Sequence, residues 1–219
     1  MIKAVIFDFD GLIMDTETEH YEVLCEIFRG YHCELPLELW GKGIGTRSNF
    51  EPFKYLEEQI RQPVEIEKLN RQTEEQFLKR LEKGTAREGV EDYLKSAKQL
   101  GLKVGLASSS DYEWISRYLN HLKLFEYFDC IKSSDDVEKV KPDPALYLKA
   151  ADCLGVKPEH CLVFEDSPNG ALAAKRAGML CVVVPNRVTK DLQFGDFDHR
   201  IHSMAETPLE DLLRMIGNK

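Results

Sequence analysis

The sequence KAVIFDFDG, at residues 3–11, is the main indication of the fold class. Its short apolar run ends at two carboxylates and a glycine, which is typical of a strand buried on both faces of a parallel sheet. Similar apolar runs follow later in the chain, at residues 103–107, 129–131, 161–164 and 180–184. Helical segments separate these runs, and the alternation predicts an α/β fold with a Rossmann-like, doubly wound parallel sheet.

The segments between the runs carry signals for the start of helices. Thr16 with Glu19, and Ser110 with Glu113, each have the spacing of a capping box. Ser167 stands before a proline, as an N-cap residue often does. These signals predict helices near residues 88–100, 111–120, 144–154, 168–177 and 208–216.

One long region interrupts the alternation of strands and helices. From about residue 15 to residue 84 the sequence has a helical character, and no run in it has the character of a strand. Its charges fit solvated helix faces. We therefore expect residues 1–14 and 85–219 to form the α/β core, with residues 15–84 as a small helical domain inserted after the first strand.

The net charge limits the classes of partner that the protein is expected to bind. The chain of 219 residues has 29 lysines and arginines against 38 acidic residues, a formal net charge of −9. An acidic balance repels polyphosphate backbones, so we expect no nucleic-acid partner. A small phosphorylated substrate needs only a local positive site and stays compatible with this charge.

Hydropathy and cysteine spacing indicate the compartment. The apolar runs are all shorter than the roughly 20 residues that cross a bilayer, and we recognise no targeting signal. We therefore expect no membrane association. The six cysteines form neither CxxC pairs nor a zinc-binding pattern. They are interpreted as reduced core thiols of a cytoplasmic protein.

Two carboxylates end the first apolar run. Asp8 and Asp10 lie at positions i and i+2, and Gly11 allows a sharp turn after them. Ligands of parallel α/β sheets bind at the carboxyl ends of the strands, where a hard cation such as Mg2+ would relieve the repulsion between two carboxylates. For this motif alone, an acidic turn that merely ends a strand is the favoured explanation.

Three further strand ends or loops carry polar residues. The second run ends at Ser108, Ser109 and Ser110, Lys141 stands before a proline, and Glu165 and Asp166 follow the fourth run. Singly, helix caps or solvated charges explain most of these residues. Converged at one edge of a sheet, two acid pairs, hydroxyls and a lysine fit Mg2+-assisted phosphoryl transfer.

The order and spacing of these motifs resemble those of the haloacid dehalogenase-like hydrolases. The resemblance is to the branch that contains β-phosphoglucomutase and small sugar-phosphate phosphatases. The sequence DFDG at 8–11 matches the first family motif, Ser108 the second, Lys141 the third, and the pair at 165–166 the fourth. The helical region of residues 15–84 matches the cap domain of this family, and the resemblance covers nearly the whole chain.

The resemblance implies catalytic roles for four residues. Asp8 would be the nucleophile that forms an aspartyl-phosphate, and Asp10 would be the general acid and then the general base. Ser108 and Lys141 would bind the transferring phosphoryl oxygens. The implied reaction is hydrolysis of a small phosphorylated metabolite, such as a sugar phosphate or a nucleoside monophosphate.

The resemblance also implies a Mg2+ site and a substrate pocket. Asp8, the backbone carbonyl of Asp10, and Asp166 would hold the ion, with Glu165 bound to it through water or orienting its neighbours. Ser109 would contribute a backbone N–H, and Gly11 belongs to the substrate-binding set. In the cap, the candidate substrate-binding residues are Glu17, His20 and Arg47, beside the less specific candidates Lys42, Gly45 and Thr46.

Alternative functions of the same family remain open at this point. A β-phosphoglucomutase-type phosphotransferase would need a second phosphate subsite in the cap. A dehalogenase would leave Asp10 without a role, because cleavage of a carbon–halogen bond needs no metal. A non-catalytic scaffold is disfavoured, since every catalytic position carries the expected residue. We expect a monomer, because a cap can close the site without a partner chain.

Overall fold

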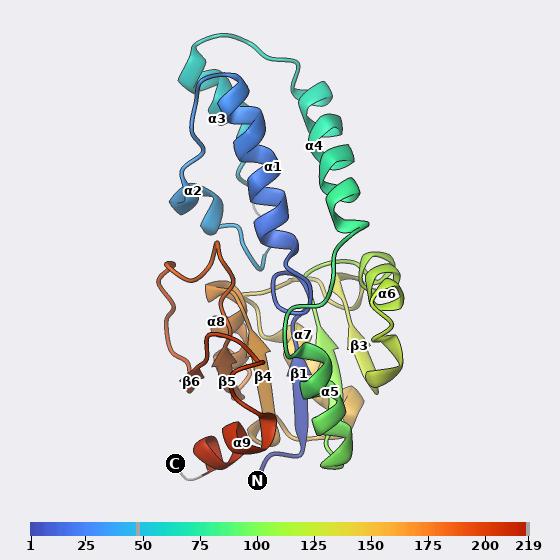
Figure 1. Cartoon of the computed structure of the whole chain (residues 1–219). Helices are drawn as coiled ribbons and strands as arrows, with labels where there is room; N and C mark the ends of the chain where they lie inside the picture. Colours follow the sequence, from blue (N-terminus) through green and yellow to red (C-terminus); the bar gives the residue numbers. More distant parts are fainter. Residues whose placement is uncertain (47–48, 218–219) are drawn as a thin grey trace.

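A six-stranded, fully parallel sheet forms the centre of the protein in the computed structural model, which describes residues 1–46 and 49–217 (Figure 1). The strand order is β3-β2-β1-β4-β5-β6. This architecture confirms the predicted Rossmann-like α/β fold. The strands are β1 (Ala4–Phe7), β2 (Lys103–Ala107), β3 (Cys130–Lys132), β4 (Cys161–Glu165), β5 (Leu180–Val183) and β6 (His199–Arg200).

The central strand β1 explains why the first apolar run has no polar face. All four of its residues are fully buried. Val5 and Phe7 pack into the hydrophobic cluster on one face of the sheet, whereas Ala4 and Ile6 pack into the cluster on the other face. Successive strand residues point to opposite faces of a sheet, so β1 needs apolar side chains at every position.

Nine α-helices accompany the sheet in the part of the chain that the structure describes. Five of them belong to the α/β layers and follow the helices predicted from the sequence. They are α5 (Val90–Gln99), α6 (Tyr112–His121), α7 (Ala145–Leu154), α8 (Pro168–Arg176) and α9 (Leu209–Gly217). Short 3-10 helices complete the connections, at Phe125–Tyr127, Ser134–Asp136 and Pro158–His160.

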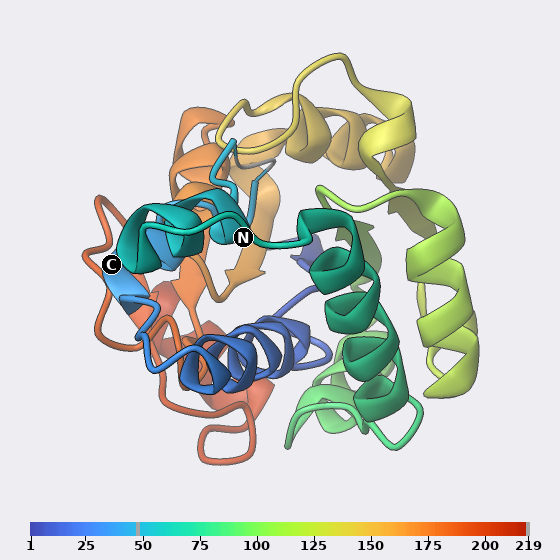
Figure 2. The same ribbon diagram turned by 90° about the horizontal axis from the view of Figure 1, so that it is seen from above.

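The other four helices stand above the carboxyl ends of the strands (Figure 1). They are α1 (Thr16–Gly30), α2 (Leu37–Gly41), α3 (Pro52–Ile60) and α4 (Ile66–Leu81). They share a hydrophobic cluster of their own, in which Phe28 of α1 and Phe53 of α3 are buried. Seen from above, α1 and α4 run beside each other over the sheet (Figure 2). The chain enters and leaves this helical region side by side, where Met14 bridges to Ala86.

Two of the predicted helix caps are wrong. The N-cap of α1 is Asp15, whose side chain accepts from the backbone N–H of Thr18, and the N-cap of α6 is Asp111. Thr16 and Ser110 stand beside these caps and direct their hydroxyls to Asp10 instead. The N-cap at Ser167 is confirmed, because its side chain accepts from the backbone N–H of Gly170.

The expectation that all cysteines are reduced is also wrong. A disulfide joins Cys130 at the start of β3 to Cys153 near the end of α7, across a sequence separation of 23. The sequence gives no sign of this pair, since only the packing of α7 against β3 brings the two residues together. The other four cysteines are free.

Among the described helices, none has the length and apolar character needed to cross a membrane.

Candidate active site

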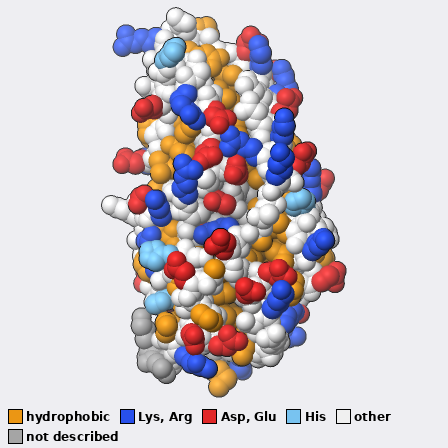
Figure 3. Space-filling view, viewed as in Figure 1, with side chains coloured by type: hydrophobic (Ala, Val, Ile, Leu, Met, Phe, Trp, Pro, Cys, Tyr) orange, Lys and Arg blue, Asp and Glu red, His pale blue; other side chains and the backbone are white. Residues whose placement is uncertain are grey.

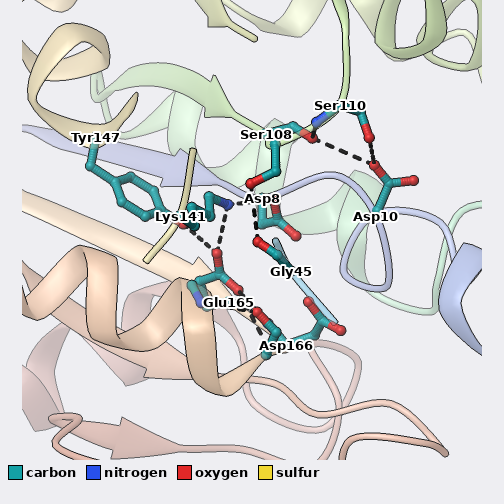
Figure 4. A network of polar contacts seen from close by, with 12 residues as sticks. Asp8, Asp10, Gly45, Ser108, Ser110, Lys141, Tyr147, Glu165 and Asp166 are labelled. Carbon is teal, nitrogen blue, oxygen red and sulfur yellow. Dashed lines mark hydrogen bonds and ion pairs between the residues drawn. The ribbon is translucent and has the colours of Figure 1, made fainter. Parts of the chain in front are cut away.

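The predicted motifs meet at the carboxyl edge of the sheet. Phe7 of β1 pairs with Leu106 on one side and with Phe164 on the other, so the residues that follow these strands emerge together. Lys141 comes from the loop before α7 and lies between two carboxylates (Figure 4). Its Nζ atom donates to Oδ1 of Asp8 at 2.5 Å and to Oε1 of Glu165 at 2.7 Å.

Asp8, Lys141 and Glu165 form a buried triad, and burial is the largest influence on the pKa values of Asp8 and Lys141. Asp8 and Lys141 are 3% and 1% exposed, and Glu165 is fully buried. Burial raises the pKa of Asp8 to about 7 against the attraction of Lys141, with a further rise caused by the negative charge of Glu165. For Lys141, burial lowers the pKa, but the two carboxylates outweigh it and keep the pKa above its ordinary value. The lysine therefore carries a permanent positive charge.

Glu165 is saturated with hydrogen-bond donors. Besides Lys141, its Oε1 accepts from the hydroxyl of Tyr147 at 2.5 Å. Its Oε2 accepts from the backbone N–H groups of Asp166 and Ser167, at 3.1 and 3.3 Å, and from Oγ of Ser167 at 3.1 Å. The side chain is thereby fixed in one orientation, with Lys141 held against it.

The acidic cluster fits a hard divalent cation. Asp8, Glu165 and Asp166 each have a carboxylate oxygen within 4.8 Å of the others. Oδ2 of Asp166 accepts from Nδ2 of Asn186 at 2.8 Å, whereas its buried Oδ1 has no hydrogen-bond partner. An unpartnered carboxylate oxygen is costly in a buried site unless a cation binds it. Oxygen ligands of this kind suit Mg2+.

Gly11 makes room for this arrangement. It has a φ of +81°, and a Cβ atom at this position would lie only 2.2 Å from Oδ2 of Asp166. The backbone carbonyl of Gly11 accepts from Nδ2 of Asn186 and from Nη1 of Arg87, at 3.2 and 2.6 Å. The glycine lets the turn after Asp10 pass directly beside the acidic cluster.

The carboxylate of Asp10 lies outside the acidic cluster and has its own set of donors. Oδ1 accepts from Oγ1 of Thr16 at 2.8 Å and from Nε1 of Trp114 at 3.0 Å. Oδ2 accepts from Oγ of Ser110 at 2.6 Å and from Oγ of Ser108 at 3.5 Å. Sequence reasoning missed Trp114 entirely, because nothing in the sequence marks a helical tryptophan as a partner of a residue 104 positions away.

A cavity of about 210 Å³ lies between this edge of the sheet and the helices α1 and α4. Glu17 and His20 of α1 face the same space as the residues at the sheet edge. The predicted site residues that line it are Asp8, Asp10, Glu17, His20, Ser108 and Ser109, and the candidates Gly45 and Thr46 line it as well. Arg47 lies outside the described residues. Lys42 is exposed, and its backbone carbonyl accepts from Nδ2 of Asn169.

Two titratable side chains of α1 that line the cavity, Glu17 and His20, have displaced pKa values. Burial, together with the negative charges of Asp10 and Asp8, raises the pKa of Glu17 to about 8. Burial lowers the pKa of His20 to about 4, so its imidazole is neutral at physiological pH. The His20 ring stacks on Phe77 at 4.8 Å and meets the edge of Trp40 at 4.9 Å between ring centroids.

The loop after α2 closes one side of the cavity. Oγ of Ser109 donates to the carbonyl of Gly45 at 3.0 Å, and Nδ2 of Asn169 donates to the carbonyl of Ile44 at 2.8 Å. Gly45 has a φ of +76° and faces Ser167, so a larger residue would push the loop away. These contacts tie the helical region to the sheet edge around the cavity.

Comparison with known proteins agrees with this geometry. The sequence profile of the haloacid dehalogenase-like hydrolases matches residues 5–184. The chain belongs to the haloacid dehalogenase-like hydrolases. The resemblance inferred from the four motifs is thereby confirmed, and the site at the sheet edge is the candidate active site of this hydrolase.

Similar proteins of this family cover essentially the full length of the chain. "Putative phosphatase YhcW" of Bacillus subtilis is 60% identical over 100% of both chains. Hexitol phosphatase B of Escherichia coli is 30% identical over 97% of both. A solved structure from Thermotoga maritima, described as a "putative beta-phosphoglucomutase", is 28% identical, covers 99% of both chains and has a TM-score of 0.75.

Proposed function

We propose that this hydrolase is a Mg2+-dependent phosphatase that acts on a small phosphorylated sugar through an aspartyl-phosphate. The observation that carries the proposal is the position of Lys141. Its ammonium group contacts Asp8 within a cluster of three buried carboxylates, and serine hydroxyls lie at the same edge. Phosphoryl transfer requires this combination of a nucleophile, fixed positive charge and hydrogen-bond donors.

In the proposed first step, a carboxylate oxygen of Asp8 bonds to phosphorus and the ester P–O bond breaks. Asp10 gives its proton to the leaving oxygen, and Lys141 and Ser108 bind the phosphoryl oxygens. In the second step Asp10 takes a proton from water, whose oxygen bonds to phosphorus. The P–O bond to Asp8 then breaks, and inorganic phosphate leaves.

Asp8, Asp166 and the backbone carbonyl of Asp10 would hold the Mg2+ ion. When bound, the ion would neutralise negative charge on the phosphoryl oxygens. Glu165 has no free oxygen for a direct bond, because five hydrogen bonds occupy its carboxylate. We propose that Glu165 positions Lys141 and Asp166 instead.

The helical region 15–84 would act as the cap domain that selects the substrate. Glu17, His20 and Arg47 are the proposed contacts to the leaving group, with Gly11 and Ser109 at the phosphate end. A cavity of about 210 Å³ is smaller than common sites for drug-sized ligands, so it favours a sugar-sized leaving group over a nucleoside. The name of Hexitol phosphatase B is consistent with this substrate class.

The surroundings of the site support the same proposal. In the view of Figure 3 acidic and basic side chains are interspersed, so this face has no single-sign field that would attract a polyanion such as nucleic acid. We propose a cytoplasmic monomer that binds neither nucleic acid nor membranes. Reduction of the pair Cys130–Cys153 in such a compartment would leave the active-site contacts intact, since neither cysteine lines the cavity.

The test is release of inorganic phosphate from a panel of sugar phosphates, nucleotides and p-nitrophenyl phosphate, with Mg2+ and with EDTA. We expect release that requires Mg2+ and is fastest with a sugar phosphate.

The variant Asp8→Asn is expected to lose turnover by at least about a thousandfold while keeping the wild-type circular dichroism spectrum, because the nucleophile is gone. A folded Asp8→Asn variant that turns over at the wild-type rate would refute the nucleophile.

A second candidate is a phosphotransferase of the β-phosphoglucomutase type. The similarity to the Thermotoga maritima structure favours it, at a TM-score of 0.75 over nearly the whole chain. Such an enzyme would convert β-glucose 1-phosphate to glucose 6-phosphate with little release of phosphate. The same assay therefore separates the two functions by their products.

A further inference from the structure

Trp114 of α6 contacts the candidate active site, both at Asp10 and at the cavity. It lies in the first turn of α6, where Oδ1 of Asp111 accepts from its backbone N–H at 2.8 Å. Its indole Nε1 donates to Oδ1 of Asp10 at 3.0 Å, and its ring lines the substrate cavity. None of the motifs of the sequence includes this residue.

An aromatic stack also holds the indole ring of Trp114 in place. The ring of Trp114 lies 5.8 Å from that of Phe77 in α4, with an interplanar angle of 18°. Phe77 in turn stacks on His20 of α1 at 4.8 Å and 26°. Offset stacking of this kind restricts the tilt and position of a ring. The stack therefore connects the indole N–H on Asp10 to two helices of the cap.

We propose that Trp114 is a positioning residue that orients the Asp10 carboxylate for protonation of the leaving oxygen, and that Phe77 holds Trp114 in place when the cap lies over the site. The proposal rests on the proposed function, in which Asp10 is the general acid. It adds a residue of α6, and through it the cap, to the machinery of the reaction.

The chemistry of the four donors on Asp10 favours this role for the indole. The hydroxyls of Thr16, Ser108 and Ser110 can rotate, and each can also accept a hydrogen bond. An indole N–H can only donate, and its ring is fixed by its neighbours. Trp114 is thus the one donor among these four that defines the direction of the Asp10 carboxylate. A catalytic group displaced by about 1 Å can lose on the order of a hundredfold in rate.

The main test is Trp114→Phe, which keeps a stacking ring and removes the N–H. We compare kcat/KM in Mg2+ for an alkyl phosphate and for p-nitrophenyl phosphate, whose leaving group needs no proton. Because kcat/KM reports only binding and the steps up to departure of the leaving group, it leaves out the later hydrolysis of the aspartyl-phosphate, in which Asp10 would act as a base. We expect a loss on the order of tenfold for the alkyl phosphate and less than about twofold for p-nitrophenyl phosphate.

The chain offers a matched control in its second tryptophan. Trp40 contacts His20 at the far end of the same stack, and its indole N–H has no hydrogen-bond partner. Trp40→Phe is the same chemical change without the contact to Asp10, and we expect it to leave the ratio of the two substrates unchanged. Phe77→Leu removes the stack but not the N–H, and we expect it to shift the ratio in the same direction as Trp114→Phe.

A readout independent of turnover uses the indole N–H itself. The chain has two tryptophans. In Trp40→Phe the remaining indole resonance in a 1H–15N spectrum therefore belongs to Trp114, and adding Asp10→Ala is expected to shift it. An unmoved resonance, or equal effects of Trp114→Phe on both substrates, would overturn the proposal.

The variant Asp10→Asn separates the two levels of inference. If it loses activity selectively for the alkyl phosphate while Trp114→Phe does not, only the role of Trp114 fails. If Asp10→Asn itself shows no selectivity, the acid role of Asp10 in the proposed function fails, and the role of Trp114 fails with it.

Discussion

At the scale of single residues, Lys141 holds together charges that repel one another. It contacts Asp8 and Glu165, and all three side chains are excluded from water. We expect Lys141→Met, unfolded with urea in EDTA, to lose about 3–5 kcal/mol of stability, because its loss leaves the buried carboxylates of Asp8 and Glu165 without a positive charge beside them.

The matched control for this prediction is Lys132→Met. Lys132 forms an ion pair with Asp136 at 3.0 Å, but both side chains are partly exposed, at 24% and 30%. Exposed pairs contribute about 0–1 kcal/mol, so the same substitution costs little there. Equal losses in the two variants would show that the buried triad has no special role in stability.

His20 gives a prediction of pH dependence. The pKa of His20 in the folded protein is about 4, below the ordinary value of 6.5. Between these two pH values the unfolded chain binds a proton at His20 and the folded protein does not. Stability from this residue is therefore lost as the pH falls from about 6.5 towards 4. We expect wild type to lose about 1–2 kcal/mol more than His20→Phe between pH 7.5 and pH 5 in urea titrations. Parallel losses in both proteins would contradict the lowered pKa.

The residues around Asp10 show where sequence reasoning stops. Asp8, Asp10 and Asp166 were predictable, because carboxylates that follow buried strands converge at one edge of a parallel sheet. The hydroxyls of Thr16 and Ser110 have two possible uses, since a residue beside a helix start can cap it or reach a neighbouring segment. Only the fold shows that Asp15 and Asp111 act as the caps and leave both hydroxyls to Asp10.

At the scale of elements, the loop after α2 tests how the helical region 15–84 contacts the sheet edge. Gly45 has a positive φ, and a Cβ atom there would lie 2.2 Å from Oγ of Ser167. We expect Gly45→Ala to lower kcat/KM for a sugar phosphate on the order of tenfold, because the loop must move off the cavity. Strain of the left-handed backbone adds a loss of about 1–2 kcal/mol in stability.

Gly101→Ala separates the clash from the strain. Gly101 has a similar φ of +71°, and a Cβ atom there meets nothing within 4 Å. We expect it to lose a similar amount of stability while kcat/KM stays within about twofold of wild type. A variant Gly45→Ala that behaves like Gly101→Ala in both measurements would show that the loop does not shape the site.

The elements also differ in how well the sequence predicts them. The five predicted strands coincide with apolar runs, because a central parallel strand is buried on both faces and cannot carry polar residues. The sixth strand, His199–Arg200, is two polar residues at the edge of the sheet and has no such run. The sequence does not predict the disulfide for a related reason, since Cys130 and Cys153 come together only through the packing of α7 on β3.

At the scale of the whole molecule, metal binding and stability are coupled. A cation that binds the folded state alone stabilises it by an amount that grows with its concentration over its dissociation constant. At about 100 times that constant the gain is about 2.7 kcal/mol, or roughly 5–10 °C in Tm for a chain of this size. We expect Mg2+ to raise the Tm of wild type by this amount relative to EDTA.

The variant Asp166→Asn should lose this response, because the unpartnered Oδ1 of Asp166 is a proposed ligand. In EDTA the same variant should be at least as stable as wild type. Burial and the charges of Asp8 and Glu165 raise the pKa of Asp166 well above its ordinary value, so a neutral amide relieves repulsion in the metal-free cluster. Asp10→Asn is the matched control, since its carboxylate lies outside the cluster and we expect the response to Mg2+ to persist. A full Mg2+ response in Asp166→Asn would place the ion elsewhere.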